Sequence, residues 1–364
     1  IQQGPAGRAN LSETVEVKQP KRGNPWKQFF LLSMRYLELL KNDRGNLLIL
    51  LLQAPVIAVI LFFLASPGVF FRSNVVTCPL NPPISPQLPQ VPITVHPRNT
   101  SDCQNVINAL RTPQGAAFAQ SKGLTLDQAL QKYISPISGG DPQKILFIMS
   151  FAAVLFGCSN GAREIVKEDP IYRRERTVNL GISPYMFSKI AVLGVLCLLQ
   201  SLVLVAVIAV RAPFDHSTFL PTFVEIYIAM ALTSLAGLMV GLAISAIVPN
   251  SDRATSFIPI VLLPQVIFSG VIFPLNSVPL QFLGSFFAAR WSMAAMGSSI
   301  GLHQAPDNSD FAYQGTLDVH VNPTNADQFA AVGHLLLMWF ALVVMIVVFG
   351  ALTAYFLRRK DIRR

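Results

Sequence analysis

The sequence predicts an all-α membrane protein with six transmembrane helices, and three observations support that prediction. The 364-residue chain is 52% hydrophobic and only 13% charged, with a mean hydropathy of +0.49, which is more apolar than a water-soluble core of this size requires. Six apolar segments are long enough to cross about 30 Å of hydrocarbon as helices. Most of the 28 Lys and Arg residues lie to one side of these segments. The predicted spans cover residues 46–65, 144–160, 187–210, 223–248, 255–275 and 330–357.

The placement of the basic residues predicts the orientation in the membrane. A formal net charge of +9 would also suit a nucleic-acid-binding protein, but the basic residues concentrate before the first span, between the second and third, and after the sixth. The positive-inside rule assigns such segments to the cytoplasm. We therefore expect no nucleic-acid partner, both termini in the cytoplasm, and a multi-pass protein of the plasma (inner) membrane.

Two segments precede the first span. Residues 1–24 are polar and unperiodic and contain Gly and Pro, which is typical of a linker, and the Ile at position 1 suggests further chain upstream. Residues 25–45 carry apolar side chains at helical spacing with basic side chains between them. That pattern predicts a helix lying at the cytoplasmic interface. The membrane domain then covers residues 46–364.

Two other segments are expected outside the membrane. Residues 66–143 are too long for a simple loop and are rich in proline in their first part, so we predict a small exoplasmic subdomain. Cys78 and Cys103 fall within it; we predict a disulfide between them, with two unrelated thiols as the alternative. Before the sixth span, Pro279 and Arg290 interrupt an apolar stretch, which predicts a re-entrant or interfacial hairpin and not a seventh span.

The segment "REIVKEDPIYRRER", residues 163–176, packs nine charged side chains into fourteen positions between two apolar spans. Asp169 and Pro170 suit the start of a helix and Gly181 suits its end, so we predict a short cytoplasmic helix over about residues 170–180. A solvated loop that obeys the positive-inside rule is one interpretation. The mixture of four acids with five bases favours a docking surface for a partner protein.

The sequence contains no motif that would supply chemistry or energy within this chain. It has no P-loop, no zinc-protease motif and no C-x-x-C, and its five His residues are scattered, so we expect no catalytic site, no metal site and no cofactor here. The predicted spans are nearly free of ionisable groups near their centres. A carrier without such a group must draw its energy from elsewhere, or else be a passive pore.

A few polar amides lie within the predicted spans, at Gln53, Gln200 and Gln265. A buried amide is costly unless it pairs with another helix or lines a cavity. Both interpretations stay open, and the cavity interpretation is strongest for Gln265 because Pro264 beside it disturbs the helix.

Three stretches resemble the membrane domain of ABC-2 type ABC transporters, closest to the G-subfamily architecture. They are "WKQFFLLSMRYLELLKNDRGN", "EIVKEDPIYRRERTVNLGISPYMFSK" and "PIVLLPQVIFSGVIFPLNSVP", at residues 26–46, 164–189 and 259–279. They follow one another in the order expected for the family, and the middle stretch is the most specific. The exoplasmic loop after span one is longer than in eukaryotic members, and the loop before span six lacks cysteines. We therefore favour a bacterial relative and carry over no drug or sterol specificity.

The resemblance implies a homodimer of six-span domains, each paired with a cytoplasmic ATPase domain that binds ATP and Mg and is usually fused upstream, so that residues 1–24 would be its linker. It also implies that the helix after span two is a coupling helix seated in the ATPase. The residues that would transmit its motion are Glu164, Arg173, Arg174, Glu175 and Arg176. Phe268 joins Gln53, Gln200 and Gln265 as a candidate wall residue of the substrate cavity.

These observations together predict the permease domain of an ATP-driven exporter. It would move a lipidic or amphipathic substrate outward by alternating access, in contact with membrane lipids. The alternative is a membrane-anchored interaction protein whose exoplasmic subdomain binds a partner without transport.

Overall fold

The computed structural model describes most of the helical part of the chain. The described residues are 24–71, 76–79, 100–102, 111–121, 123–125, 137–138, 140–177, 180–214, 218–273, 275, 277–302 and 325–362. The segment 1–23, predicted to be a linker, lies outside this set. So does Cys103, and with it the predicted disulfide to Cys78.

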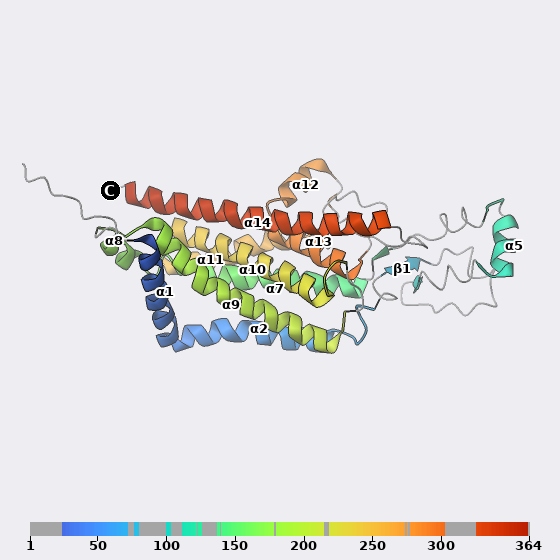
Figure 1. The fold of residues 1–364 in the computed structure, drawn as a ribbon, viewed down its shortest axis with the longest axis horizontal. Helices are drawn as coiled ribbons and strands as arrows, with labels where there is room; N and C mark the ends of the chain where they lie inside the picture. Colours follow the sequence, from blue (N-terminus) through green and yellow to red (C-terminus); the bar gives the residue numbers. More distant parts are fainter. Residues whose placement is uncertain are drawn as a thin grey trace, which may run out of the picture.

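Long apolar helices run side by side along the long axis of the molecule (Figure 1). Five of them are long and apolar enough to cross a membrane. α11 lies in the same bundle but has only 17 residues and contains two prolines, so the sixth span stays a prediction. The six helices are α2 (Arg44–Leu64), α7 (Gly140–Gly161), α9 (Ile182–Arg211), α10 (Thr222–Ile247), α11 (Ser251–Ile267) and α14 (Asn325–Ile362).

The centre of the bundle is the contact between α7 and α10, where four glycines let the two backbones touch. A Cβ on Gly157 would lie 1.9 Å from the backbone oxygen of Ser234, and one on Gly161 would lie 2.7 Å from that of Leu238. Gly237 and Gly241 of α10 meet the α7 backbone in the same way. Each helix therefore contributes a G-x-x-x-G pair, the pattern that allows close helix approach in membranes. α9, α13 and α14 also pack against α10.

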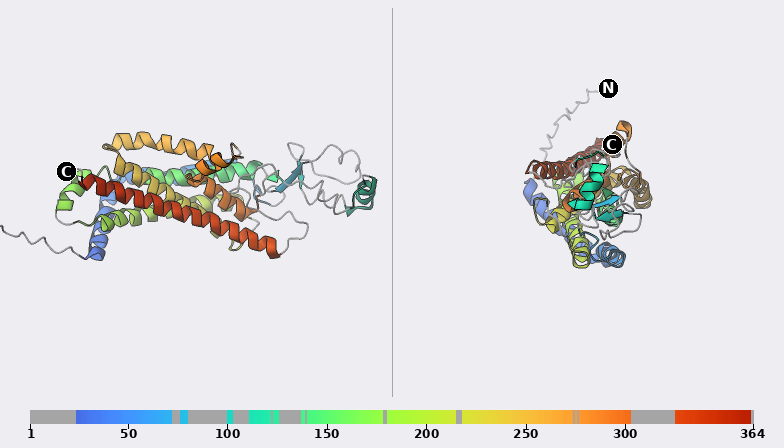
Figure 2. Two further views of the ribbon diagram at one scale, coloured as in Figure 1. Left: turned by 90° about the horizontal axis from the view of Figure 1, so that it is seen from above. Right: turned by 90° about the vertical axis from the view of Figure 1, so that its right-hand side faces the viewer.

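The two ends of the bundle differ. α1 (Pro25–Asn42) runs across one end of the bundle, and α8 (Asp169–Thr177) lies at the same end (Figures 1 and 2). α1 begins at Asn24, whose side chain accepts a hydrogen bond from the Trp26 amide at 3.1 Å. A helix is thus present where the interfacial helix was predicted.

The opposite end carries three short antiparallel strands and the helix α5 (Pro113–Ser121), which lies beyond them. The strands were not predicted. They are β1 (Val76–Pro79), β2 (Thr100–Asp102) and β3 (Ile137–Ser138), in the order β2-β1-β3. In this register Cys78 pairs with Ser101. All three strands come from the segment predicted to form an exoplasmic subdomain.

Two helices occupy the segment predicted to be a re-entrant hairpin. α12 (Val278–Gly284) projects from the bundle, whereas α13 (Ala288–Ile300) packs against α7, α10 and α14. α13 ends at Gly301, which has a left-handed conformation with φ of 71°. How deeply this pair enters a membrane stays a prediction.

Candidate functional site

The candidate site is the charged segment that follows α7, together with the helix α8. The turn before α8 is fixed to α10 because the Ser245 hydroxyl accepts hydrogen bonds from the Ile165 and Val166 amides at 2.9 and 3.0 Å. α8 then begins at Asp169, whose carboxylate pairs with Arg173 one turn later at 2.6 Å. The short helix predicted over about 170–180 is therefore present and ends at Thr177.

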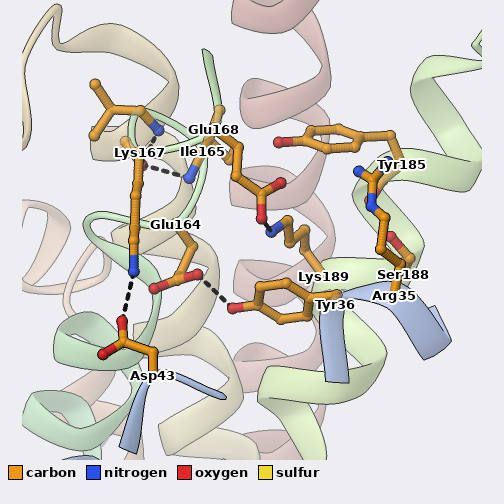
Figure 3. Close-up of polar contacts among 12 residues, drawn as sticks. Arg35, Tyr36, Asp43, Glu164, Ile165, Lys167, Glu168, Tyr185, Ser188 and Lys189 are labelled. Carbon is orange, nitrogen blue, oxygen red and sulfur yellow. Dashed lines mark hydrogen bonds and ion pairs between the residues drawn. The ribbon is translucent and has the colours of Figure 1, made fainter. Parts of the chain in front are cut away.

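Two acids of the segment point into the protein. The Tyr36 hydroxyl donates a hydrogen bond to the buried Glu164 carboxylate at 2.5 Å, and Lys189 pairs with the buried Glu168 at 2.5 Å (Figure 3). These contacts join α1, the turn and α9. A buried charge is strongly unfavourable unless it is paired or hydrogen-bonded. The two contacts therefore restrain how the three elements can sit relative to one another.

Tyr36 contacts both Glu164 and Lys189. Its hydroxyl binds Glu164, and the Lys189 ammonium lies 3.4 Å from the centroid of its ring, a cation–π contact. Burial raises the pKa of Tyr36 well above its usual value, so the hydroxyl keeps the proton that it donates. Tyr185 is also buried, and its ring lies at a tilt against that of Tyr172 of α8, with the ring centroids 4.8 Å apart. The Tyr185 hydroxyl has no hydrogen-bond partner among the described residues.

The other two acids of the segment are paired near the surface. Glu175 forms an ion pair with Arg35 of α1, and this hydrogen bond raises the pKa of Arg35. Asp169 has the contact with Arg173 described above. Among the bases of the segment, Lys167 binds Asp43 at 2.8 Å, at the junction of α1 and α2, and this hydrogen bond lowers the pKa of Asp43. Together with the Tyr36–Glu164 hydrogen bond, these contacts tie α8 and its preceding turn to α1 at three points.

Most of the bases of the segment face outward. Arg163, Lys167, Arg173 and Arg174 are exposed, with Ile171 also exposed among them. Arg176 is half-buried and donates a hydrogen bond to the carbonyl of Leu180. The docking interpretation expected both signs of charge on the surface. In the structure all four acids are paired with residues of this chain, two of them in buried positions, and most of the bases lie on the exposed surface.

The predicted polar wall residues fall into two separate places. Gln53 donates to the Asn160 side chain at 3.2 Å, Asn160 donates to Gln200 at 2.8 Å, and Gln200 donates to the Leu50 carbonyl at 2.6 Å. This chain of bonds joins α2, α7 and α9 and uses the amides as contacts between helices. Gln265 lies elsewhere, on α11, where it accepts a hydrogen bond from the Ala289 amide. Phe268 stacks on Phe287 in the same area.

Three of the residues that build these contacts were not singled out from the sequence. Lys189 stands inside a predicted apolar span, and a lone cation in such a place predicts a buried acid nearby. Asn160 closes the second predicted span and signals a polar contact between helices. Ser245 gave no signal, because a serine in an apolar helix is common. Among the described residues, no three His, Cys, Asp or Glu side chains gather as a metal site would require.

Comparison with known proteins identifies the family. The chain is 30% identical over 166 residues to an ABC transporter ATP-binding/permease protein of Mycobacterium tuberculosis. That segment covers 44% of this chain but only 19% of the length of the relative. The family described as ABC-2 type transporter matches residues 106–300, which is more than half of the chain and includes α7 to α13 with the charged segment. The chain belongs to the ABC-2 type transporter family and supplies its multi-pass membrane domain.

Proposed function

We propose that this chain is the permease domain of an ATP-driven exporter, and that α8 is the helix through which an ATPase domain moves it. The exporter contains two copies of this domain, works by alternating access, and moves a lipidic or amphipathic substrate out of the cytoplasm. ATP and Mg are bound by the ATPase domain. Both termini and α8 lie in the cytoplasm, and the exporter sits in the plasma (inner) membrane.

The sorting of charge around α8 is the observation that carries this proposal. An isolated solvated loop would need no buried partners for its acids, yet all four acids of the segment are bound within the chain. The exposed side chains of Arg163, Lys167, Arg173 and Arg174 lie on the outer surface, where a protein with an acidic surface would contact them. The relative is named as an ATP-binding/permease protein, which supports an ATPase domain as that partner.

α8 is also well placed to pass a force into the bundle. Arg35 holds it to α1, the Tyr172–Tyr185 contact holds it to α9, and Leu357 of α14 packs in the same apolar cluster as Tyr172. A displacement of α8 by a partner would therefore act on three helices at once. Rigid packed elements are the means by which such motion travels.

A lipidic substrate is supported by the outer surface of the bundle. α11 exposes Phe257, Ile260, Leu263 and Ile267, and α12 exposes Val278, Phe282 and further apolar side chains. An apolar surface of this kind suits contact with lipid tails. It offers no described charged site that would select a small polar ion.

The experiment that tests the proposal reverses the two exposed arginines of α8. Arg173→Glu/Arg174→Glu should abolish ATP-dependent transport and substrate stimulation of ATP hydrolysis in the assembled transporter, because the new acids would repel the acidic partner surface. Arg176 is left in place because it binds the Leu180 carbonyl. The matched control is Lys144→Glu, a reversal of an exposed base at the opposite end of α7.

Transport would be followed in proteoliposomes with a fluorescent phospholipid, and membrane insertion by quantitative blotting. Insertion should be normal for both variants, and only the α8 variant should lose stimulation. Full stimulation in the α8 variant would contradict the coupling role. If no ATPase domain associates with this chain, the result would favour the alternative hypothesis, in which the chain is a membrane-anchored interaction protein.

A further inference from the structure

α13 is a fixed part of the bundle. Twelve of its thirteen residues are buried, with Trp291 as the exception, and it packs against α7, α10 and α14. At its start, the Ser150 hydroxyl of α7 donates a hydrogen bond to the Ala289 carbonyl at 3.2 Å. A helix buried on this scale cannot move without carrying its neighbours.

α11 is held much less firmly. Only Ala254, Leu262 and Gln265 of its 17 residues are buried. Pro259 and Pro264 lie inside the helix, and each removes a backbone hydrogen bond and favours bending. α11 is therefore a helix that can shift while α13 stays in place.

Two side-chain contacts join these unlike helices. The Gln265 side-chain oxygen accepts a hydrogen bond from the Ala289 amide at 2.9 Å. That amide lies in the first turn of α13, where the residue before the helix, Phe287, supplies no side-chain cap. Next to it, the Phe268 and Phe287 rings stack in parallel with centroids 4.9 Å apart and planes at 6°.

The backbone can bend on both sides of this contact. Pro264 directly precedes Gln265, and Gly270, two residues after Phe268, has φ of 79°. That left-handed conformation suits Gly and allows the chain to turn sharply where α11 ends. Apart from the apolar packing of Leu262 in one cluster with Ala288 and Ala289, the contact between α11 and α13 consists of one hydrogen bond and one ring pair. A contact of this size can be broken and remade without unfolding either helix.

We propose that Gln265 and Phe268 form a latch between α11 and α13 that opens during each transport cycle. The closed latch blocks the outward route along α11, and its opening lets the substrate leave. Gln265 is thus a positioning residue that acts on α13 through the Ala289 amide. The latch rests on the proposed function, since it needs ATP-driven motion to open it.

Cross-linking in the full transporter tests whether the latch opens. In Phe268→Cys/Phe287→Cys the two side chains face each other and can be joined by a short bis-methanethiosulfonate reagent. The matched control is Ser201→Cys/Ser234→Cys, whose hydroxyls lie 3.2 Å apart between the packed helices α9 and α10. Peptide mapping by mass spectrometry would separate these bonds from any formed by the native cysteines.

We expect the yield at 268–287 to fall several-fold when the transporter is trapped with ATP and vanadate, while the yield at 201–234 stays the same. Equal yields at 268–287 in the nucleotide-free and trapped states, with ATP hydrolysis intact, would overturn the latch alone. A transporter that binds an ATPase domain yet hydrolyses no ATP would overturn the proposed function and the latch together.

One substitution tests the role of the acceptor oxygen. Gln265→Met keeps the length of the side chain but cannot accept the bond. We expect Gln265→Met to transport several-fold less fluorescent phospholipid per ATP hydrolysed than wild type. Equal coupling ratios in the Met variant and wild type would overturn the role of Gln265.

Discussion

Tyr36 shows how much one buried side chain can hold together. Its hydroxyl binds Glu164, its ring faces the Lys189 ammonium, and only 4% of the residue is exposed. A buried carboxylate that loses its donor bears the full cost of being removed from water. The hydroxyl and the ring therefore make separable contributions, and each can be removed alone.

Tyr36→Phe keeps the ring over Lys189 and removes only the hydroxyl. We expect the free energy of unfolding to fall by about 1–3 kcal/mol, because Glu164 is left without this donor. The matched control is Tyr185→Phe, since the Tyr185 hydroxyl is buried with no described hydrogen-bond partner; it should change stability little. Denaturant titration of the purified protein in detergent measures both, and equal losses would contradict the role given to the Tyr36 hydroxyl.

At the scale of elements, the pairing of α7 with α10 depends on glycine. The predicted spans identified both helices but not which of them would pack most closely. The G-x-x-x-G spacing of Gly157 with Gly161 and of Gly237 with Gly241 was visible in the sequence. Only the structure shows that the two pairs face each other, with backbone where a Cβ would stand.

Gly157→Ala should separate α7 from α10, because the added Cβ would lie 1.9 Å from the Ser234 backbone oxygen. Overpacking of this kind costs at least about 1–3 kcal/mol. Gly333→Ala on α14 is the control, since a Cβ there meets nothing within 4 Å. Thermal unfolding in detergent should show a lower midpoint temperature for Gly157→Ala than for Gly333→Ala. Similar midpoint temperatures for the two variants would contradict the need for close contact between α7 and α10.

At the scale of the whole molecule, the two ends of the bundle should face opposite sides of the membrane. The charged segment, α1 and the end of α14 lie at one end, and the strands and α5 lie at the other. This arrangement agrees with the distribution of basic residues in the sequence. It places Lys167 and Lys144, both exposed, on opposite sides.

Single cysteines at these positions test that orientation. In a background lacking Cys78 and Cys103, Lys144→Cys should react with a membrane-impermeant maleimide in intact cells, and Lys167→Cys only after the membrane is opened. Labelling of Lys167→Cys in intact cells would reverse the topology and remove α8 from the reach of a cytoplasmic ATPase.

The sequence alone was enough for the features that depend on local pattern. Apolar length predicted five of the long helices, Asp169 and Pro170 predicted the start of α8, and the charge of segment 163–176 marked the candidate site. The short strands were missed because a proline-rich stretch carries no clear alternation of side chains. α11 ends earlier than the predicted span because the chain turns soon after Ile267, close to Gly270.

The tertiary structure was needed for every contact between distant parts of the chain. Tyr36 and Glu164 are 128 positions apart, and Arg35 and Glu175 are 140 apart. No periodicity links such pairs, because each depends on how two helices cross. Local pattern could therefore show that the segment after α7 was charged, but only packing could show that two of its acids are buried and that most of its bases are exposed.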